Sequence, residues 1–597
     1  MHSVWRSSLH TLLPVVVACC PTLGTGAVAQ TVDDPLHVTP RELPHSPAAP
    51  TVAPPRNVEQ PVSNADKIII PELKGLRLVA KASDIAPGSA SGSGVTVQDL
   101  PLLANAKIQS VLSDFIGRPL TFGAMAQISQ AITDWYRARH HPFVDVAFPP
   151  QGLANGVLQA VVTEFRAGKI TVNGNRWFET GFLRDQLRIQ SGEPIDDARL
   201  DADVQWINQN PFIRSSITAQ KSETPGGTDL TLDVQDRFPL SAYAEYANDG
   251  PPALTRDRWR FGANWGDAFG EGQQLAYQLT ASDDFFRRNI GGSGGESAFV
   301  AHALNYEAPL PWRDMFTVSA FYERATPRLG PFLGLTGTIA QVSLRYVKPL
   351  PALDWLTQQL SFGYDFKSSN STLNFGGFLV SSATAQVDQF SVTYDATASD
   401  AYGTTILDNE FFFSPGRLTS QNNDAAFRVQ ANNPYVKARY GYDRLSLTRY
   451  QPLWSLLSIT RLTAQFGSQN LLPSEQLQAG GIDSVRGYDE DAANGSRGIL
   501  LSEELRAPAF SVLQQLSPEF PEDQMQLDVF WDYASLYNHG GIYGIPAHVA
   551  LSSVGVGAHY VIAENFTLRF EYGWQLDRAP NASRRGEQAS IDLTISY

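Results

Sequence analysis

The sequence predicts two small α+β modules followed by a C-terminal antiparallel transmembrane β-barrel of about 16 strands. Three observations lead to this fold class. The N-terminus resembles an export signal, yet no later segment holds about 18 consecutive apolar residues, so insertion into a membrane would require β-strands. Residues 67–237 combine helical periodicity with short strands, in an arrangement that occurs twice. Residues 238–597 instead alternate apolar and polar side chains with a period of two.

Residues 1–29 have the three parts of a cleavable signal peptide. Arg6 supplies positive charge, residues 9–20 are mostly apolar, and Ala27-Val28-Ala29 offers a cleavage site. Lipoprotein processing at Cys19 is the alternative, because the residues before it loosely match a lipobox. Both cysteines of the chain lie in this segment, so we expect the mature protein to contain no disulfide and no thiol nucleophile.

A linker precedes the two α+β modules. Residues 30–66 are rich in Pro, Ala, Thr and Val, a composition that cannot build a packed core and predicts an extended chain. The modules follow at residues 67–166 and 167–237, and each has the order strand, helix, helix, strand, strand. In the first module, Ile128 and Ile132 lie at helical spacing after a break at Gly117–Pro119.

The barrel region, residues 238–597, shows its period-two pattern most clearly at the end. In SIDLTISY, residues 590–597, the apolar residues Ile591, Leu593, Ile595 and Tyr597 share one face. The polar residues between them share the other face. A soluble sandwich would also alternate, but charged residues within the strands suit a water-filled lumen better than a packed core. Aromatic residues near strand ends resemble interfacial girdles, and short turns alternate with longer polar loops. Candidate strands lie near residues 240, 258, 274, 298, 315, 338, 358, 386, 404, 434, 456, 499, 526, 551, 566 and 588.

Composition and motifs argue against nucleic-acid binding and against catalysis. The formal net charge is -15 and no basic run is present, whereas neutralising phosphates needs clustered Lys and Arg. The sequence contains no H-E-x-x-H or P-loop motif and no convincing Ser/His/Asp set, so we expect no enzyme, no metal and no other cofactor. His140 and His141 are expected to be a surface pair, because neighbouring side chains point apart. Asp489-Glu490-Asp491 is expected to be a solvated loop, with a calcium site as the alternative.

A long Gly-rich loop, residues 471–498, joins two of the predicted strands and carries Arg486 near its centre. It is too long for a tight turn, so it is either functional or disordered. In a later strand, Asp528, Phe530 and Asp532 should face the lumen. If the loop folded inward, Arg486 could form a bidentate ion pair with a carboxylate of this inner wall, and the glycines would permit the sharp turns.

These motifs resemble those of a known family. The run Val485-Arg486-Gly487-Tyr488, followed by the motif Phe530-x-Asp532 and preceded by two βααββ modules, is similar to the TpsB-type transporters of two-partner secretion, the hemolysin/hemagglutinin secretion-activation family. In the first module, Tyr136, Pro150-Gln151 and Gly156 are similar to that family's signature. The resemblance covers the chain from about Lys67 onward and implies that both modules are POTRA domains.

The resemblance also implies a function. It describes an outer-membrane transporter whose periplasmic POTRA domains bind an unfolded exoprotein, by strand addition at their sheet edges. The partner would cross the barrel lumen without ATP and fold, or be activated, outside the cell. Arg486 and Asp532 would latch the loop and control the pore. Tyr597 would belong to the signal by which the barrel-assembly machinery inserts the chain into outer-membrane lipid.

The chain departs from the family pattern at three places, and two other functions remain alternatives. The F-x-D-x-G motif ends here in Ala534, and His140-His141 stand where the family usually has a glycine. Family members often have an N-terminal plug helix, whereas residues 30–66 hold too many prolines to predict a long helix. A barrel-assembly insertase would usually have more modules, and a passive porin would need neither the modules nor the loop motif.

Overall fold

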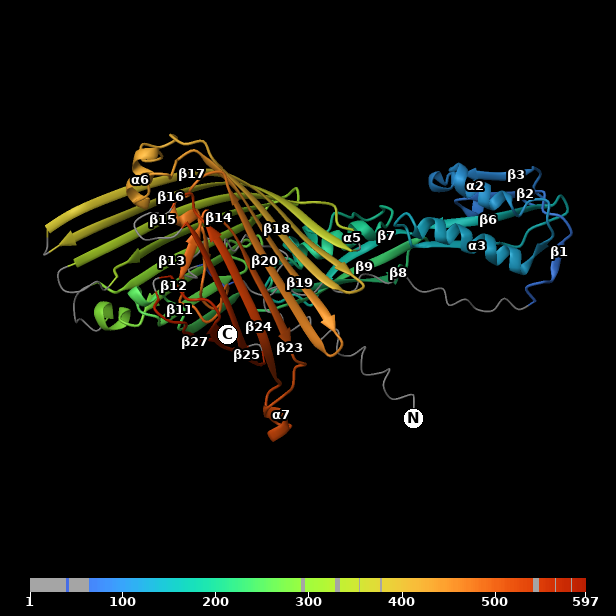
Figure 1. Ribbon diagram of the computed structural model, residues 1–597. Coiled ribbons are helices and arrows are strands. Elements are labelled where there is room, and N and C mark those ends of the chain that lie inside the picture. Colours follow the sequence, from blue (N-terminus) through green and yellow to red (C-terminus); the bar gives the residue numbers. More distant parts are fainter. Residues whose placement is uncertain are drawn as a thin grey trace. The chain divides into compact units, whose positions relative to one another are not determined.

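The computed structural model describes residues 39–41, 64–290, 296–327, 333–353, 355–375, 378–540, 547–563, 565–580 and 582–597. The chain divides into two compact units, one of residues 45–238 and the other of residues 1–44 and 239–597 (Figure 1). The expected signal peptide lies outside the described residues, as does the expected linker except for residues 39–41 and 64–66. Among the described residues, no helix is long and apolar enough to span a membrane.

The first α+β module has a four-stranded sheet in the order β3-β2-β6-β5. Helix α3 begins at Phe122, where the Thr121 hydroxyl caps it by accepting a hydrogen bond from Ala124 N. The helix buries Ile128 and Ile132 in the core of the module. Strands β1, β3 and β4 are additional to the elements that the sequence pattern predicts. The elements are β1 (Ile68–Ile70), β2 (Gly75–Val79), β3 (Gly94–Gln98), α2 (Ala106–Ser113), β4 (Leu120–Thr121), α3 (Phe122–Arg137), β5 (Val144–Ala147) and β6 (Val157–Glu164), with 3-10 turns at Ala82–Asp84 and Pro101–Leu103.

The second module follows the predicted order of strand, helix, helix, strand, strand. Its sheet has the order β7-β9-β8. Helix α5 begins after Asp196, whose side chain accepts a hydrogen bond from Arg199 N. The Asp236 carboxylate accepts hydrogen bonds from the amides of Trp177 and Phe178, just before α4. The elements are β7 (Arg166–Asn173), α4 (Thr180–Asp185), α5 (Asp197–Ile207), β8 (Ile213–Lys221) and β9 (Gly227–Asp236).

The two modules are in contact through His140 and His141. His140 has φ 64°, a left-handed conformation that glycine adopts most easily, and this accounts for the glycine that the family usually has here. The Nδ1 of His140 lies 3.1 Å from Asp197 Oδ1, and its carbonyl accepts a hydrogen bond from Asp197 N at 3.0 Å. The Nδ1 of His141 lies 3.1 Å from the carbonyl oxygen of Ile195. The His140 side chain is 62% exposed. The imidazole rings of His140 and His141 nevertheless both contact residues of the second module.

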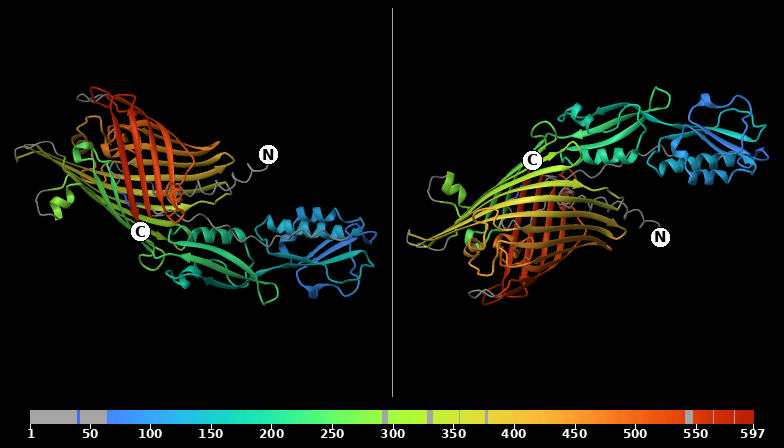
Figure 2. Two further views of the ribbon diagram at one scale, coloured as in Figure 1. Left: turned by 90° about the horizontal axis from the view of Figure 1, so that it is seen from below. Right: turned by 90° about the horizontal axis from the view of Figure 1, so that it is seen from above.

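Sixteen described strands form one closed antiparallel barrel, which confirms the predicted strand number (Figures 1 and 2). Other elements of this unit connect the wall strands and are not part of the wall: a 3-10 turn at Pro252–Leu254, a π-helical turn at Phe286–Ile290, and helices α6 (Asp424–Ala431) and α7 (Leu513–Leu516). The barrel strands are β10 (Leu240–Ala247), β11 (Arg258–Trp265), β12 (Gln274–Ser282), β13 (Phe299–Pro309), β14 (Met315–Ala325), β15 (Leu333–Pro349), β16 (Leu356–Phe375), β17 (Phe378–Asp400), β18 (Gly403–Ser414), β19 (Tyr440–Leu453), β20 (Leu456–Gly467), β23 (Arg497–Arg506), β24 (Asp523–Tyr537), β25 (His548–Ile562), β26 (Phe566–Gln575) and β27 (Glu587–Ser596).

The barrel closes between its first and last strands, β10 and β27. Residues Tyr243 to Ala247 pair with Ser596 to Asp592 in five register pairs, whereas the flanking ladders β10–β11 and β26–β27 have eight and nine. The C-terminal residue extends this seam, because Tyr597 N donates to Ala242 O at 2.9 Å and Ser241 Oγ donates to Tyr597 O at 2.7 Å. The Tyr597 side chain is 91% exposed.

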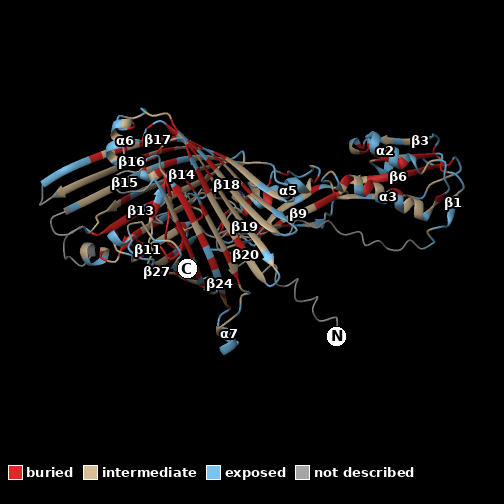
Figure 3. Ribbon diagram, viewed as in Figure 1, coloured by how far each residue is buried: buried red, intermediate tan, exposed pale blue. Residues whose placement is uncertain are grey.

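Strand β24 shows how the two faces of the wall differ (Figure 3). Leu527, Val529 and Trp531 are 40–53% exposed, whereas the alternate residues Asp528, Phe530 and Asp532 are at most 4% exposed. The outward face is therefore apolar and the inward face polar, as a lipid-embedded barrel with a polar lumen requires.

Exposed aromatic side chains gather on the turns at the end where the chain enters the barrel. The turns after β11, β13, β15 and β19 all lie at this end, because successive strands run in opposite directions. They carry Phe269, Trp312, Trp355 and Trp454, which are 56–97% exposed. Such a ring is typical of the interface between lipid and water.

Candidate functional site in the barrel lumen

The connection between β20 and β23 is an ordered segment. Residues 468–496, called here the lumen loop, contain a 3-10 turn at Pro473–Glu475 and two paired strands, β21 (Leu477–Ala479) and β22 (Ala493–Gly495). Val485 and Tyr488 are fully buried, in one apolar cluster with residues of β23, β24 and β25. The sequence left disorder open for this segment, but it packs against the inner wall of the barrel.

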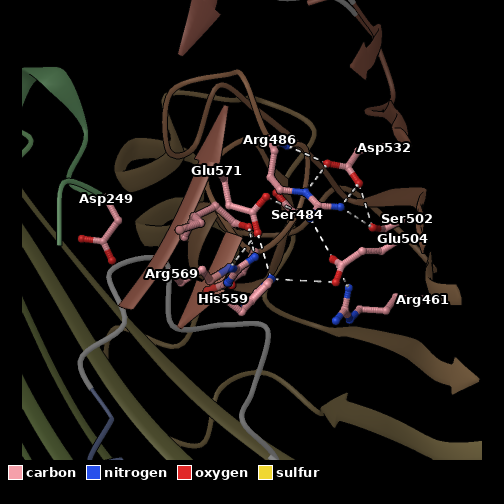
Figure 4. Close-up of polar contacts among 12 residues, drawn as sticks. Asp249, Arg461, Ser484, Arg486, Ser502, Glu504, Asp532, His559, Arg569 and Glu571 are labelled. Atoms are coloured by element: carbon pink, nitrogen blue, oxygen red, sulfur yellow. Dashed lines mark hydrogen bonds and ion pairs between the residues drawn. The ribbon is translucent and has the colours of Figure 1, made fainter. Parts of the chain in front are cut away.

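Arg486 and Asp532 are in direct contact (Figure 4). The Nε and Nη2 atoms of Arg486 donate to the two carboxylate oxygens of Asp532, each at 2.8 Å. The Arg486 backbone N also donates to this carboxylate, at 3.0 Å. The two side chains are 3% and 0% exposed. A bidentate pair fixes orientation as well as distance, so it determines how the lumen loop lies against β24.

Phe530 supplies an apolar face to the same guanidinium. The Arg486 Cζ lies 3.5 Å from the centroid of the Phe530 ring, which places the cation over the aromatic face. On the neighbouring strand the ring covers Gly555, where a Cβ would lie 2.2 Å from a ring carbon. Phe530 and Asp532 are two residues apart and so share a face of β24, one stacking on the arginine and the other pairing with it.

Three further groups from the wall contact Arg486 and were not predicted. Its Nη1 donates to Glu504 Oε2 at 2.9 Å and lies 3.5 Å from Glu571 Oε2, while its Nη2 donates to Ser502 Oγ at 3.1 Å. The arginine therefore contacts β23, β24 and β26 (Figure 4). Period-two alternation assigns Glu504 to the lumen, because Ile499, Leu501 and Leu505 share the opposite face. It does not show which acidic residues of the lumen lie at the same level along the barrel axis.

The residues after Arg486 fit tightly against the wall. Gly487 has φ 89°, and a Cβ on it would lie 2.8 Å from the carbonyl carbon of Gly573 on β26. The Tyr488 hydroxyl lies 2.9 Å from the carbonyl oxygen of Ser552 and 2.8 Å from that of Asp577. The run from Val485 to Tyr488 thus provides one buried apolar residue, one charge, one close backbone approach and one buried hydroxyl.

Acidic residues on both sides of this run form ion pairs. Asp483 Oδ1 lies 2.6 Å from Arg569 Nη1 on β26. Asp489 Oδ1 lies 2.5 Å from Arg256 Nη2, in the connection between β10 and β11. The side chain of Asp489 is 41% exposed, as in a solvated loop, but the structure also gives it a cationic partner.

One group of described residues has the spacing of metal ligands. Ligand atoms of Glu504, Asp528 and His559 all lie within 4.8 Å of one another, and His559 Nε2 lies 3.2 Å from Asp528 Oδ1. However, Glu504 already accepts hydrogen bonds from Arg486 at 2.9 Å and from Arg506 at 2.5 Å. A divalent cation would have to displace a guanidinium there, so this group fits a network of balanced charges around Arg486 better than a metal site.

Part of the expected linker contacts the barrel wall. The backbone N of Arg41 donates to Tyr243 Oη at 2.8 Å, and the Tyr243 hydroxyl donates to Gln278 Oε1 at 2.6 Å. Tyr243 and Gln278 belong to β10 and β12 and are 6% and 2% exposed. The described part of the linker is therefore in contact with buried residues of the first barrel strands.

Family models match most of the described chain. The model described as "Haemolysin secretion/activation protein ShlB/FhaC/HecB" matches residues 226–558, which is more than half of the chain. Residues 92–164 match the ShlB-type POTRA domain, and residues 165–237 match a POTRA model described as surface antigen variable number repeat. The two modules are thus POTRA domains, as the resemblance implied.

Similar proteins are distant in sequence but similar in length and fold. Heme/hemopexin transporter protein HuxB of Haemophilus influenzae is 20% identical over 496 residues, covering 80% of this chain and 81% of HuxB. Outer membrane transporter CdiB of Dickeya dadantii is 21% identical over 463 residues, covering 74% of this chain and 77% of CdiB. The solved structure of CdiB from Escherichia coli has a TM-score of 0.69 at 16% identity and covers 93% of this chain and 94% of CdiB. CdiB from Acinetobacter baumannii has a TM-score of 0.62 at 16% identity, with 94% of both chains covered.

These matches agree with the closed barrel, its apolar outer face and the two modules before it. The chain belongs to the haemolysin secretion/activation family, outer-membrane transporters with periplasmic POTRA domains that secrete a partner exoprotein.

Proposed function

We propose that the unfolded exoprotein passes through the barrel lumen and that the lumen loop controls this passage. The observation that carries the proposal is the buried contact of Arg486 with Asp532 and Glu504, which holds the loop inside the pore. A polypeptide that enters the lumen has to displace the loop or pass beside it. The step needs no ATP, because folding of the exoprotein outside the cell prevents its return.

The POTRA domains capture the exoprotein in the periplasm. Edge strands support this role, because a strand with one unpaired side can pair with an extended peptide. In the second module, β8 (Ile213–Lys221) pairs among the described strands with β9 alone, and the Asn208 side chain bonds the backbone of Ser215 near the start of its outer edge. The edge strand β5 of the first module is shorter, with four residues.

The proposal also includes the limits of the domains and two further partners, outer-membrane lipid and the barrel-assembly machinery. The signal peptide occupies residues 1–29, the linker residues 30–66, and the transmembrane barrel residues 238–597; the POTRA domains occupy residues 67–166 and 167–237. Outer-membrane lipid contacts the apolar outer face. The barrel-assembly machinery recognises the last strand, β27, together with Tyr597, which follows it.

Reconstitution tests this function. The full-length chain is placed in liposomes, and the exported protein encoded beside its gene is added unfolded on the POTRA side. We expect protease-protected or released exoprotein on the other side without ATP, and none with liposomes that hold a passive porin. Insertion of unrelated barrels in place of exoprotein transfer would instead identify an insertase.

A further inference from the structure

A second buried ion pair holds the beginning of the lumen loop. Glu475, in the turn Pro473–Glu475, is 0% exposed. Its carboxylate lies 2.9 Å from Lys367 Nζ on β16 and accepts hydrogen bonds from Gln389 Nε2 on β17, at 3.1 Å, and from Tyr442 Oη on β19, at 3.0 Å. The three donors are themselves at most 4% exposed. Lys367 on the barrel wall thus supplies a cation to Glu475, and Ser474 of the loop also donates to its carboxylate, at 3.0 Å.

Apolar contacts support the same anchor. Leu471 and Leu472 are 0% and 2% exposed, in one cluster with Phe412 and Tyr440. The Gln465 side chain on β20 donates to the carbonyl oxygen of Glu475 at 3.0 Å. Side chains and backbone therefore both attach this part of the lumen loop to the wall.

Side chains of the lumen loop are bound to strands that lie far apart in the barrel sheet. In the ring of sixteen strands, β16 is seventh and β26 is fifteenth, so eight steps separate them in either direction. Lys367 on β16 holds Glu475, whereas Arg569 on β26 holds Asp483. Between Glu475 and Asp483 the chain follows the inner wall, because Leu477 and Ala479 pack against residues of β23 and β24.

We propose that Glu475 and Lys367 are positioning residues that form a second anchor of the lumen loop, independent of Arg486. This inference rests on the proposed role of the loop in the pore. Because Glu475 and Arg486 bind different residues of the wall, the release of Arg486 alone leaves the loop attached at Glu475. Opening of the pore requires the release of both anchors, and their free energies add.

Conductance of the purified full-length chain in planar bilayers tests the second anchor, with potassium chloride as the probe. Glu475→Gln removes the charge of Glu475 while keeping its shape. We expect the fraction of time in the open state to rise about tenfold or more, because Lys367 then loses its buried partner. Lys367→Glu should have the same effect, and the exchange Lys367→Glu with Glu475→Lys should restore the wild-type value. Glu503→Gln is the control, since the Glu503 carboxylate on β23 accepts hydrogen bonds from Ser458 and Thr460 on the neighbouring wall strand β20.

The combination with Arg486→Ala tests independence. We expect the fold-changes of Glu475→Gln and Arg486→Ala to multiply in the double variant. Heat-modified migration on gels checks that each barrel is folded. A Glu475→Gln channel like the wild type or the Glu503→Gln control would overturn the second anchor, as would a charge exchange that fails to restore the wild-type value. Exoprotein transfer in liposomes is scored separately: its absence for the wild type would overturn the proposed function and leave the conductance result standing.

Discussion

Gly487 of the lumen loop and Gly573 of β26 meet backbone to backbone. A Cβ added to Gly573 would lie 2.6 Å from the amide nitrogen of Gly487, and one added to Gly487 would lie 2.8 Å from the carbonyl carbon of Gly573. Real Cβ atoms do not approach backbone so closely. This contact seats the residue after Arg486 directly on the wall, and no side chain fits at either position.

The first prediction concerns this contact. Gly573→Ala should push the lumen loop off β26 and weaken the hydrogen bonds of Arg486, while the barrel itself still folds. Secretion of the exoprotein by cells should fall at least about tenfold, because backbone cannot yield as a flexible side chain does. Gly441→Ala on β19 is the control, since its Cβ would lie no closer than 3.5 Å to any atom. Equal secretion by both variants would contradict the close contact.

The second prediction concerns the arginine. Arg486→Ala leaves the Asp532 carboxylate buried without its cation and removes one of the cations that pair with Glu504. Breaking a buried pair in this way costs about 3–5 kcal/mol in comparable cases. We expect secretion to be strongly reduced while the barrel still inserts. Arg486→Lys should also fail, because an ammonium cannot pair bidentately with Asp532 and stack on Phe530. Arg449→Ala, which removes an exposed pair with Asp400, is the control. Normal secretion by Arg486→Ala would exclude the role proposed for this residue.

The third prediction separates capture from passage. Deletion of residues 67–236 removes both POTRA domains but none of the barrel strands. Secretion should be abolished, while ion conductance in planar bilayers remains. Secretion at the wild-type level would show that the exoprotein reaches the pore without the POTRA domains.

The fourth prediction concerns pH and the second POTRA domain. Burial, and secondly the nearby Asp197, raise the pKa of Asp201 on α5 from 3.8 to about 6. Since this pKa is higher in the folded state, the protonated form stabilises the fold. That stability is complete below about pH 4 and is lost as the pH rises towards about 6. Amides of α5 should therefore exchange more slowly at pH 4.5 than at pH 7, after correction for intrinsic rates.

Asp201→Asn should remove this pH dependence, because the amide stays neutral at every pH. Hydrogen exchange of the full-length variant, followed by mass spectrometry, measures the effect. Asp145→Asn, at an exposed position of β5, should leave the dependence unchanged. An Asp201→Asn variant with the same pH dependence as the wild type would assign it to other groups.

Period-two alternation, together with charges within the strands, aromatic residues near strand ends and the alternation of short and long loops, predicted the barrel and its lumen-facing residues. It assigned Asp532 to the inner face, and the family motif paired that residue with Arg486. It could not predict that Glu504 contacts Arg486 or that Lys367 pairs with Glu475. Alternation gives the face on which a residue lies, but not its level along the barrel axis. Height in a barrel depends on strand tilt and on the register of every ladder between the two residues.

Local capping explains one error in the strand positions. A strand was expected near residue 434, but β19 begins at Tyr440. Asn423 caps α6 by accepting hydrogen bonds from Ala425 N and Ala426 N, and Asn432, with φ 46°, ends the helix. The chain therefore makes a helical turn and a reversal before the strand can start.

The seam between β10 and β27 has a consequence for how the barrel forms. Tyr243 and Ser596 are neighbours across the seam, although they lie at opposite ends of the barrel sequence. Joining such distant segments costs more chain entropy than closing any hairpin in the wall, and this ladder has only five register pairs to offset that cost. The seam is thus the slowest ladder to form. Until it does, β10 and β27 are open sheet edges, each able to pair with the wrong strand.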